Sequence, residues 1–156
     1  MSKAVQRARI VLMRYHDRGS EVVDVEGFPR AEGVQVVRWP LNDPVSGVLL
    51  REPSPVVSVN AAHNINRQRF MMAHEYYHYL YHKSLDKLMC MTNLDDTRTC
   101  EREANRFAAS LLMPGHVVRD LLHQYDSETV AERIMVSAEA LQWRLKELGI
   151  VEGMPA

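Results

Sequence analysis

Hydrophobic positions recur with helical spacing near the start of the chain, with strand-like spacing after residue 33, and with helical spacing again from about residue 64. Apolar residues over 3–16 fall at intervals of three and four, which predicts a helix. The stretch 21–33 is ambiguous, because Gly27 and Pro29 disfavour a long helix there. Valine-rich runs separated by proline-containing turns predict about three strands of an antiparallel or mixed sheet, over 34–39, 45–50 and 56–59.

The rest of the chain is predicted to be mainly helical. Asn64 or Asn66 is a suitable N-cap for the first helix of this part. A helix, then a sheet, then a helical block is an order typical of an α+β domain. We therefore expect a single domain over 1–156, with a helix and sheet over about 1–62 and a helical part over about 63–150. The predicted helices cover 66–83, 98–112, 115–124, 128–135 and 138–148, and a loop covers 84–96.

The composition is that of an ordinary globular protein. Of the 156 residues, 46% are hydrophobic and 25% are charged. The net charge of -1 argues against a dedicated nucleic-acid binder, which usually carries a basic surplus. No apolar stretch approaches the roughly 18 residues that a membrane helix needs. Arginines interrupt any signal-like segment near the start, so we expect a cytoplasmic protein with no membrane partner.

One segment carries recognisable chemistry. His74, Glu75 and His78 form an H-E-x-x-H pattern inside the predicted helix 66–83. Side chains four residues apart lie about 5–6 Å from one another on one helix face, so the two imidazoles can bind one divalent ion. Glu75 is then placed to take a proton from water. Apolar residues surround the motif, which indicates burial, and buried histidines need partners such as a metal.

A catalytic zinc site needs a third protein ligand. The longer pattern H-E-x-x-H-x-x-G-x-x-H, which supplies a third histidine, is excluded because the chain has Tyr81 and Ser84 at the two diagnostic positions. An acidic residue from the next predicted helix is the alternative, and both Glu101 and Glu103 are available. Glu103 borders the apolar face that includes Phe107. We therefore expect Glu103, rather than Glu101, to complete a His, His, Glu metal site.

Two runs of the sequence, 67–78 and 101–114, strongly resemble the ImmA/IrrE family of zinc metallopeptidases. Weaker similarity to that family extends over 57–60 and 136–148. The resemblance implies a zincin-like fold with a gluzincin-like ligand set. By motif position it implies that zinc is bound by His74, His78 and Glu103 and that Glu75 is the general base.

The same resemblance implies a biological role. Members of this family are cytosolic endopeptidases that cleave a helix-turn-helix transcriptional repressor, which derepresses stress-response or mobile-element genes. A repressor protein is therefore the expected substrate or partner. The donor set suits Zn²⁺, and Mn²⁺ or Fe²⁺ can occupy the same ligands.

Residues near the motif are expected to contact the substrate. The strand over 56–60 could bind an extended peptide by β-augmentation, through main-chain hydrogen bonds. His82 follows His78 by one turn, but three ligands along one straight helix cannot converge on one ion, so we expect it either in the pocket wall or in contact with a metal ligand. The expected substrate-binding residues are Val59, Asn60, Tyr81 and His82.

Two other functions agree with parts of the sequence. The domain could keep its metal without catalysis and bind a helix-turn-helix regulator, as one component of a toxin–antitoxin-like pair. The presence of Glu75 favours the enzyme, because a structural metal site has no use for it. Residues 128–148 could instead form a DNA-reading helix-turn-helix. The neutral charge and four local carboxylates argue against such direct nucleic-acid binding: Glu128, Glu132, Glu139 and Glu147.

Overall fold

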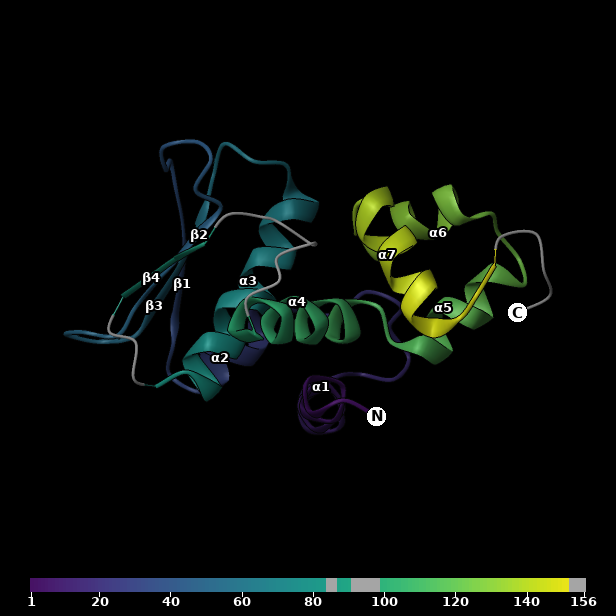
Figure 1. Cartoon of the computed structure of the whole chain (residues 1–156), viewed down its shortest axis with the longest axis horizontal. Coiled ribbons are helices and arrows are strands. Elements are labelled where there is room, and N and C mark those ends of the chain that lie inside the picture. Colours follow the sequence, from purple (N-terminus) through teal and green to yellow (C-terminus); the bar gives the residue numbers. More distant parts are fainter. Residues whose placement is uncertain (84–86, 91–98, 152–156) are drawn as a thin grey trace.

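The computed structural model describes residues 1–83, 87–90 and 99–151. Figure 1 shows the sheet at one end of the molecule, the C-terminal helices at the other end and long helices between them. The elements in chain order are α1 (Lys3–Tyr15), α2 (Gly27–Ala31), β1 (Gln35–Trp39), β2 (Gly47–Leu50), β3 (Val56–Asn60), α3 (Ile65–Tyr81), β4 (Lys87–Cys90), α4 (Thr99–Leu112), α5 (Gly115–Leu122), α6 (Ser127–Ile134) and α7 (Ala138–Leu148).

The sheet is mixed and confirms the predicted α+β class. Its strand order is β1-β3-β2-β4, with β1 parallel to β3 and the two other pairs antiparallel. The three predicted strands are present, and β4 is a fourth strand inside the segment 84–96 that the sequence predicted to be a loop. The segment as a whole is rich in Asp, Thr and Asn, which favour a loop, but β4 itself contains none of these residues and pairs with β2, a contact distant in sequence.

The position of β3 corrects one expectation about the substrate. Strand β3 lies between β1 and β2 and is hydrogen-bonded on both sides, with Val59 opposite Arg38 of β1 and Gly47 of β2. A peptide can add only to a free sheet edge. The prediction that the strand over 56–60 binds substrate by β-augmentation is therefore wrong.

Helix α3 crosses the middle of the molecule and packs on the sheet (Figure 1). Its N-cap is Asn64, whose side chain accepts from the backbone N–H of Arg67 at 3.0 Å. Every residue from Gln68 to His78 is buried, as the apolar surroundings of the motif predicted. At the other end Arg51, which follows β2, donates to the carbonyl oxygens of His78 at 2.7 Å and His82 at 2.9 Å. These bonds satisfy helix-terminal acceptors and place a cation where the helix dipole favours one.

Helix α4 packs against α3 through small side chains. Ala104 and Ala108 are fully buried, and their size lets the two helix backbones approach closely. Phe107 packs on Tyr77 of α3, with ring centroids 4.8 Å apart. On the far side of α4 lies α1 (Figure 1), so α4 is enclosed between two helices.

The three C-terminal helices follow the predicted boundaries closely. Ser137 caps α7 by accepting from the backbone N–H of Ala140 at 3.0 Å, and Gly149 ends that helix with a φ of 71°. This left-handed conformation is one that glycine adopts at little cost. Among the described residues, no helix is both long enough and apolar enough to cross a membrane.

Candidate metal centre

Three buried side chains from α3 and α4 face one another. His74 Nε2 lies 3.0 Å from Glu101 Oε2, and His78 Nε2 lies 2.9 Å from Glu101 Oε1. The two histidine Nε2 atoms are 3.1 Å apart. His74, His78 and Glu101 are at most 4% exposed. The cluster combines two ligands from one turn of α3 with one carboxylate from the start of α4.

The chemistry and spacing of these donors fit a metal ion. Imidazole nitrogens and a carboxylate form an established zinc ligand set. Metal–ligand bonds of about 2.0–2.1 Å in a tetrahedral site place ligand atoms about 3.3 Å apart, close to the spacing between His74, His78 and Glu101. Three protein donors also leave one coordination position for water or substrate, as in catalytic zinc sites.

The tautomer of the first histidine is fixed by Asn105, one turn after Glu101 on α4. His74 Nδ1 lies 2.9 Å from Asn105 Oδ1. An amide oxygen can only accept, so the neutral form of His74 carries its proton on Nδ1 and presents the Nε2 lone pair to the cluster. This arrangement orients the ring and keeps the ligating nitrogen available.

Replacing Asn105 with alanine is expected to weaken metal binding without removing the site. Loss of the hydrogen-bond partner of a histidine ligand typically costs about 10–100-fold in metal affinity. Competition with a fluorescent zinc chelator would measure this change. Asn66→Ala is the matched control, since the Asn66 amide bonds the Val136 carbonyl on another part of the structure. Equal zinc affinity in the two variants would contradict the role given to Asn105.

At Glu101 and His78, electrostatics favour the protonation states that a metal requires, whereas His74 would have to lose a proton when a metal binds. Burial acts to raise the pKa of Glu101, but the hydrogen bonds from His74 and His78 outweigh it and hold that pKa well below its usual range. Burial lowers the pKa of His78 to about 4. For His74, burial acts in the same direction, but Glu101 and Glu75 outweigh it and raise the pKa. Glu101 is therefore ionised and His78 neutral at pH 7, as metal ligands must be.

The carboxylate of Glu75 lies against strand β2. Glu75 is fully buried, and it contributes to the raised pKa of His74. The position of Gly47 explains how this carboxylate fits under the sheet. A Cβ added at Gly47 would lie 3.1 Å from Glu75 Oε1 and 3.2 Å from its Cγ, which is tighter than ordinary van der Waals contact. Glycine at position 47 therefore leaves the space that the Glu75 side chain uses.

Gly47→Ala is expected to destabilise the protein and to displace Glu75. Adding one methyl group to a tightly packed site typically costs about 1–3 kcal/mol. Urea unfolding would measure the change in the free energy of unfolding. Gly19→Ala is the control, because its Cβ would lie 3.4 Å from its nearest neighbour, Asp17 Oδ1. A Gly47→Ala variant as stable as Gly19→Ala would show that Glu75 moves freely.

Glu103, the expected third ligand, lies outside the cluster, and this expectation is corrected to Glu101. Its carboxylate accepts from the Tyr77 hydroxyl at 3.0 Å and lies 3.8 Å from His82 Nε2. The reason is geometric. Glu103 lies on the same side of α4 as Phe107, which packs on Tyr77 rather than toward the motif histidines.

The two expected pocket residues at the end of α3 have different neighbours. His82 Nδ1 lies 2.6 Å from His78 Nδ1, so His82 contacts a candidate ligand directly. Tyr81 packs under the guanidinium of Arg7, which is 3.6 Å from the ring centroid. Arg7 also donates to the Tyr77 hydroxyl at 2.7 Å. These contacts place His82 beside the metal centre and Tyr81 in a packed contact with α1.

Val59 and Asn60 are fully buried in the sheet. The Asn60 side chain amide donates to the carbonyl oxygens of Leu41 at 3.2 Å and Val45 at 2.9 Å, and its oxygen accepts from the Ala62 N–H at 3.0 Å. These bonds organise the loop between β1 and β2. The structure thus gives Asn60 a structural position, and substrate contact by Val59 or Asn60 stays a prediction.

Comparison with known proteins gives a family and a fold. The family model Peptidase_M78, described as the IrrE N-terminal-like domain, matches residues 30–146. A solved structure of a Mycobacterium tuberculosis transcriptional regulator is similar, with a TM-score of 0.70 and 18% sequence identity. The similarity covers 94% of this chain and 47% of that chain, so the chain spans about half the length of that protein. The comparison with curated proteins gives no match.

Proposed function

The chain belongs to the M78 peptidase family of IrrE N-terminal-like domains, and on this basis we propose that it is a zinc-dependent endopeptidase that cleaves a helix-turn-helix transcriptional repressor. One observation carries the proposal. The motif histidines meet a buried carboxylate from α4, while a second buried carboxylate, Glu75, acts electrostatically on the first of them, His74. A site that only stabilises the fold needs no such second carboxylate. The likeness to a transcriptional regulator agrees with a substrate of the regulatory class.

In this proposal some residues of the site bind the metal and another transfers the proton. His74, His78 and Glu101 would hold the metal, and zinc bound there would acidify a water molecule and polarise a peptide carbonyl. Glu75 accepts the proton from the attacking water as the new C–O bond forms. It then gives that proton to the amine nitrogen as the C–N bond breaks. Cleavage thus yields a carboxyl fragment and an amine fragment, with Glu75 returned to its starting state.

The proposal is tested with candidate substrates chosen by position in the genome. Purified zinc-loaded protein is incubated with each helix-turn-helix regulator encoded beside its gene, and the products are analysed by mass spectrometry. We expect one regulator to be cut into two fragments, with cutting abolished by a chelator and restored by zinc. A stable complex with a regulator that stays intact would overturn the peptidase proposal in favour of a toxin–antitoxin-like partner.

A further inference from the structure

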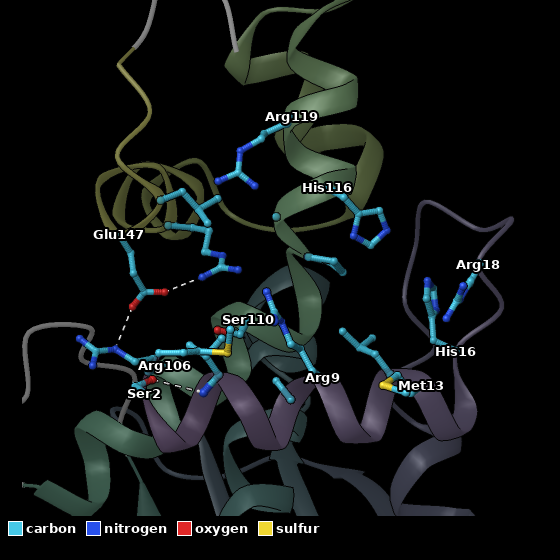
Figure 2. Close-up of a pocket in the computed structure, with 18 residues that line it drawn as sticks. Ser2, Arg9, Met13, His16, Arg18, Arg106, Ser110, His116, Arg119 and Glu147 are labelled. Carbon is cyan, nitrogen blue, oxygen red and sulfur yellow. Dashed lines mark hydrogen bonds and ion pairs between the residues drawn. The ribbon is translucent and has the colours of Figure 1, made fainter.

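A cavity of about 1070 Å³ lies at the opposite end of α4 from the metal centre. Figure 2 shows its lining side chains converging from α1, α4, α5 and the last turns of α7. Its volume is on the scale of pockets that hold small ligands. The cavity shares no residue with His74, Glu75, His78 or Glu101. The proposed peptidase activity gives it no role.

The lining of this cavity is strongly basic. Among its described residues the single carboxylate is Glu147, which accepts from Arg106 at 2.9 Å and from Arg144 at 2.6 Å. The other three guanidinium groups in the lining, those of Arg9, Arg18 and Arg119, make no hydrogen bond or ion pair with any described residue. The arginines in the lining are Arg9, Arg18, Arg106, Arg119 and Arg144.

These cations interact unfavourably with one another. Arg144 is 5% exposed, and burial lowers its pKa. Arg119 and Arg9 lower that pKa further, although Glu147 acts in the opposite direction. Like charges brought together in a partly enclosed space raise the free energy of the protein unless an anion joins them. The arrangement therefore favours binding of a ligand with more than one negative charge.

Uncharged donors face the same space. Ser110 is 4% exposed, and its buried Oγ has no hydrogen-bond partner in the described structure. Helix α5 begins at the cavity without a side-chain cap, so its first N–H groups have no partner within the helix. A Cβ at Gly115 would lie 2.9 Å from Arg119 Nη1, which shows that Arg119 folds back over this helix start. An uncapped helix N-terminus beside a guanidinium and a hydroxyl is suited to phosphate.

We propose that this cavity binds a small phosphorylated molecule of the nucleotide type. Its phosphates are held by Arg9, Arg119, the Ser110 hydroxyl and the N-terminus of α5. Its apolar part lies against Leu12 of α1, which also lines the cavity. Several cations suit a diphosphate better than a single carboxylate, because each guanidinium can pair with its own phosphate oxygens.

The test measures binding of inorganic pyrophosphate and of ADP to the zinc-loaded protein by isothermal titration calorimetry. We expect both to bind, ADP more tightly because it also buries an apolar ring, and both more weakly at high salt. Arg9→Gln should weaken binding about 10-fold, and Ser110→Ala about 3-fold. Arg14→Gln is the matched control, since it removes the same charge from α1 at a position outside the cavity.

Each alternative outcome is decisive. If Arg9→Gln binds pyrophosphate as tightly as Arg14→Gln does, the anion is held elsewhere, for example by the zinc, and the proposal fails. Failure of both probes to bind at millimolar concentration also overturns it. A short DNA duplex that binds through Arg9 and Arg119 while neither small anion binds would make this surface a nucleic-acid interface instead. Circular dichroism of each variant confirms that the fold is intact.

Discussion

Glu75→Gln is expected to abolish cleavage of the regulator substrate while leaving the metal centre loaded. The amide keeps the size of the carboxylate, so it fits the space beside Gly47. It cannot accept a proton at neutral pH, and loss of a positioned general base typically slows a reaction by about 10²–10⁴-fold. The rate of fragment formation, measured under single-turnover conditions at saturating substrate, reports this step directly.

Two controls distinguish loss of the proton acceptor in Glu75→Gln from general damage to the metal site. Zinc content of Glu75→Gln should equal that of the wild type, since Glu75 is not in the His, His, Glu cluster. Gln68→Glu adds a negative charge to the same helix, whereas Glu75→Gln removes one. Gln68 is buried and accepts a hydrogen bond from Arg38, and a folded Gln68→Glu variant should retain cleavage. Cleavage by Glu75→Gln at the wild-type rate would exclude Glu75 as the general base.

The sequence was sufficient to predict α3 and the histidine pair. The H-E-x-x-H spacing and the surrounding apolar residues are local properties, and both survive folding because a helix fixes the relation between positions i and i+4. Asn64, one of the two predicted N-caps of this helix, is equally local. Such features depend on a few consecutive residues, and the structure agrees with them.

The identity of the third candidate ligand depends on how α4 is rotated about its own axis relative to α3. The pattern of apolar residues predicts this rotation incorrectly. The apolar pattern predicts that the side of α4 with Phe107 meets the motif histidines, whereas Phe107 packs beside Tyr77. The small residues are the better guide. Glu101 lies three and seven positions before Ala104 and Ala108, on the stripe where α4 approaches α3 most closely. Asn105 lies on this stripe too. A prediction that used the small residues to define the face of α4 toward α3 would therefore have found both Glu101 and Asn105.

The order of strands in the sheet depends on contacts between distant segments. Strands β1, β2 and β3 were visible as valine-rich runs, but no local signal indicates that β3 pairs with both β1 and β2. The roles of Gly47 and Asn60 follow from that order. Gly47 lies over Glu75 because β2 crosses α3 at that point, and Asn60 is buried because its strand is internal.

Glu101→Gln is expected to lose the metal, whereas Glu103→Gln is expected to keep it. The Glu101 carboxylate is shared by both histidines at 3.0 and 2.9 Å, and its negative charge offsets that of a divalent cation. Loss of a direct ligand should weaken zinc binding by more than about 100-fold, the upper end of what losing a ligand's hydrogen-bond partner costs. Glu103 bonds the Tyr77 hydroxyl instead, so its substitution leaves all three donors in place.

Elemental analysis of the proteins purified without added metal, followed by chelator competition, distinguishes the two glutamates. About one zinc per chain in the wild type and in Glu103→Gln, and none in Glu101→Gln, is the expected result. Glutamine keeps the size and shape of the side chain, and the thermal midpoint of metal-free Glu101→Gln should match that of metal-free wild type if the fold is unchanged. Zinc lost from Glu103→Gln but retained by Glu101→Gln would return the third ligand to Glu103. That result would also require α4 to rotate so that the position facing His74 and His78 changes by two residues.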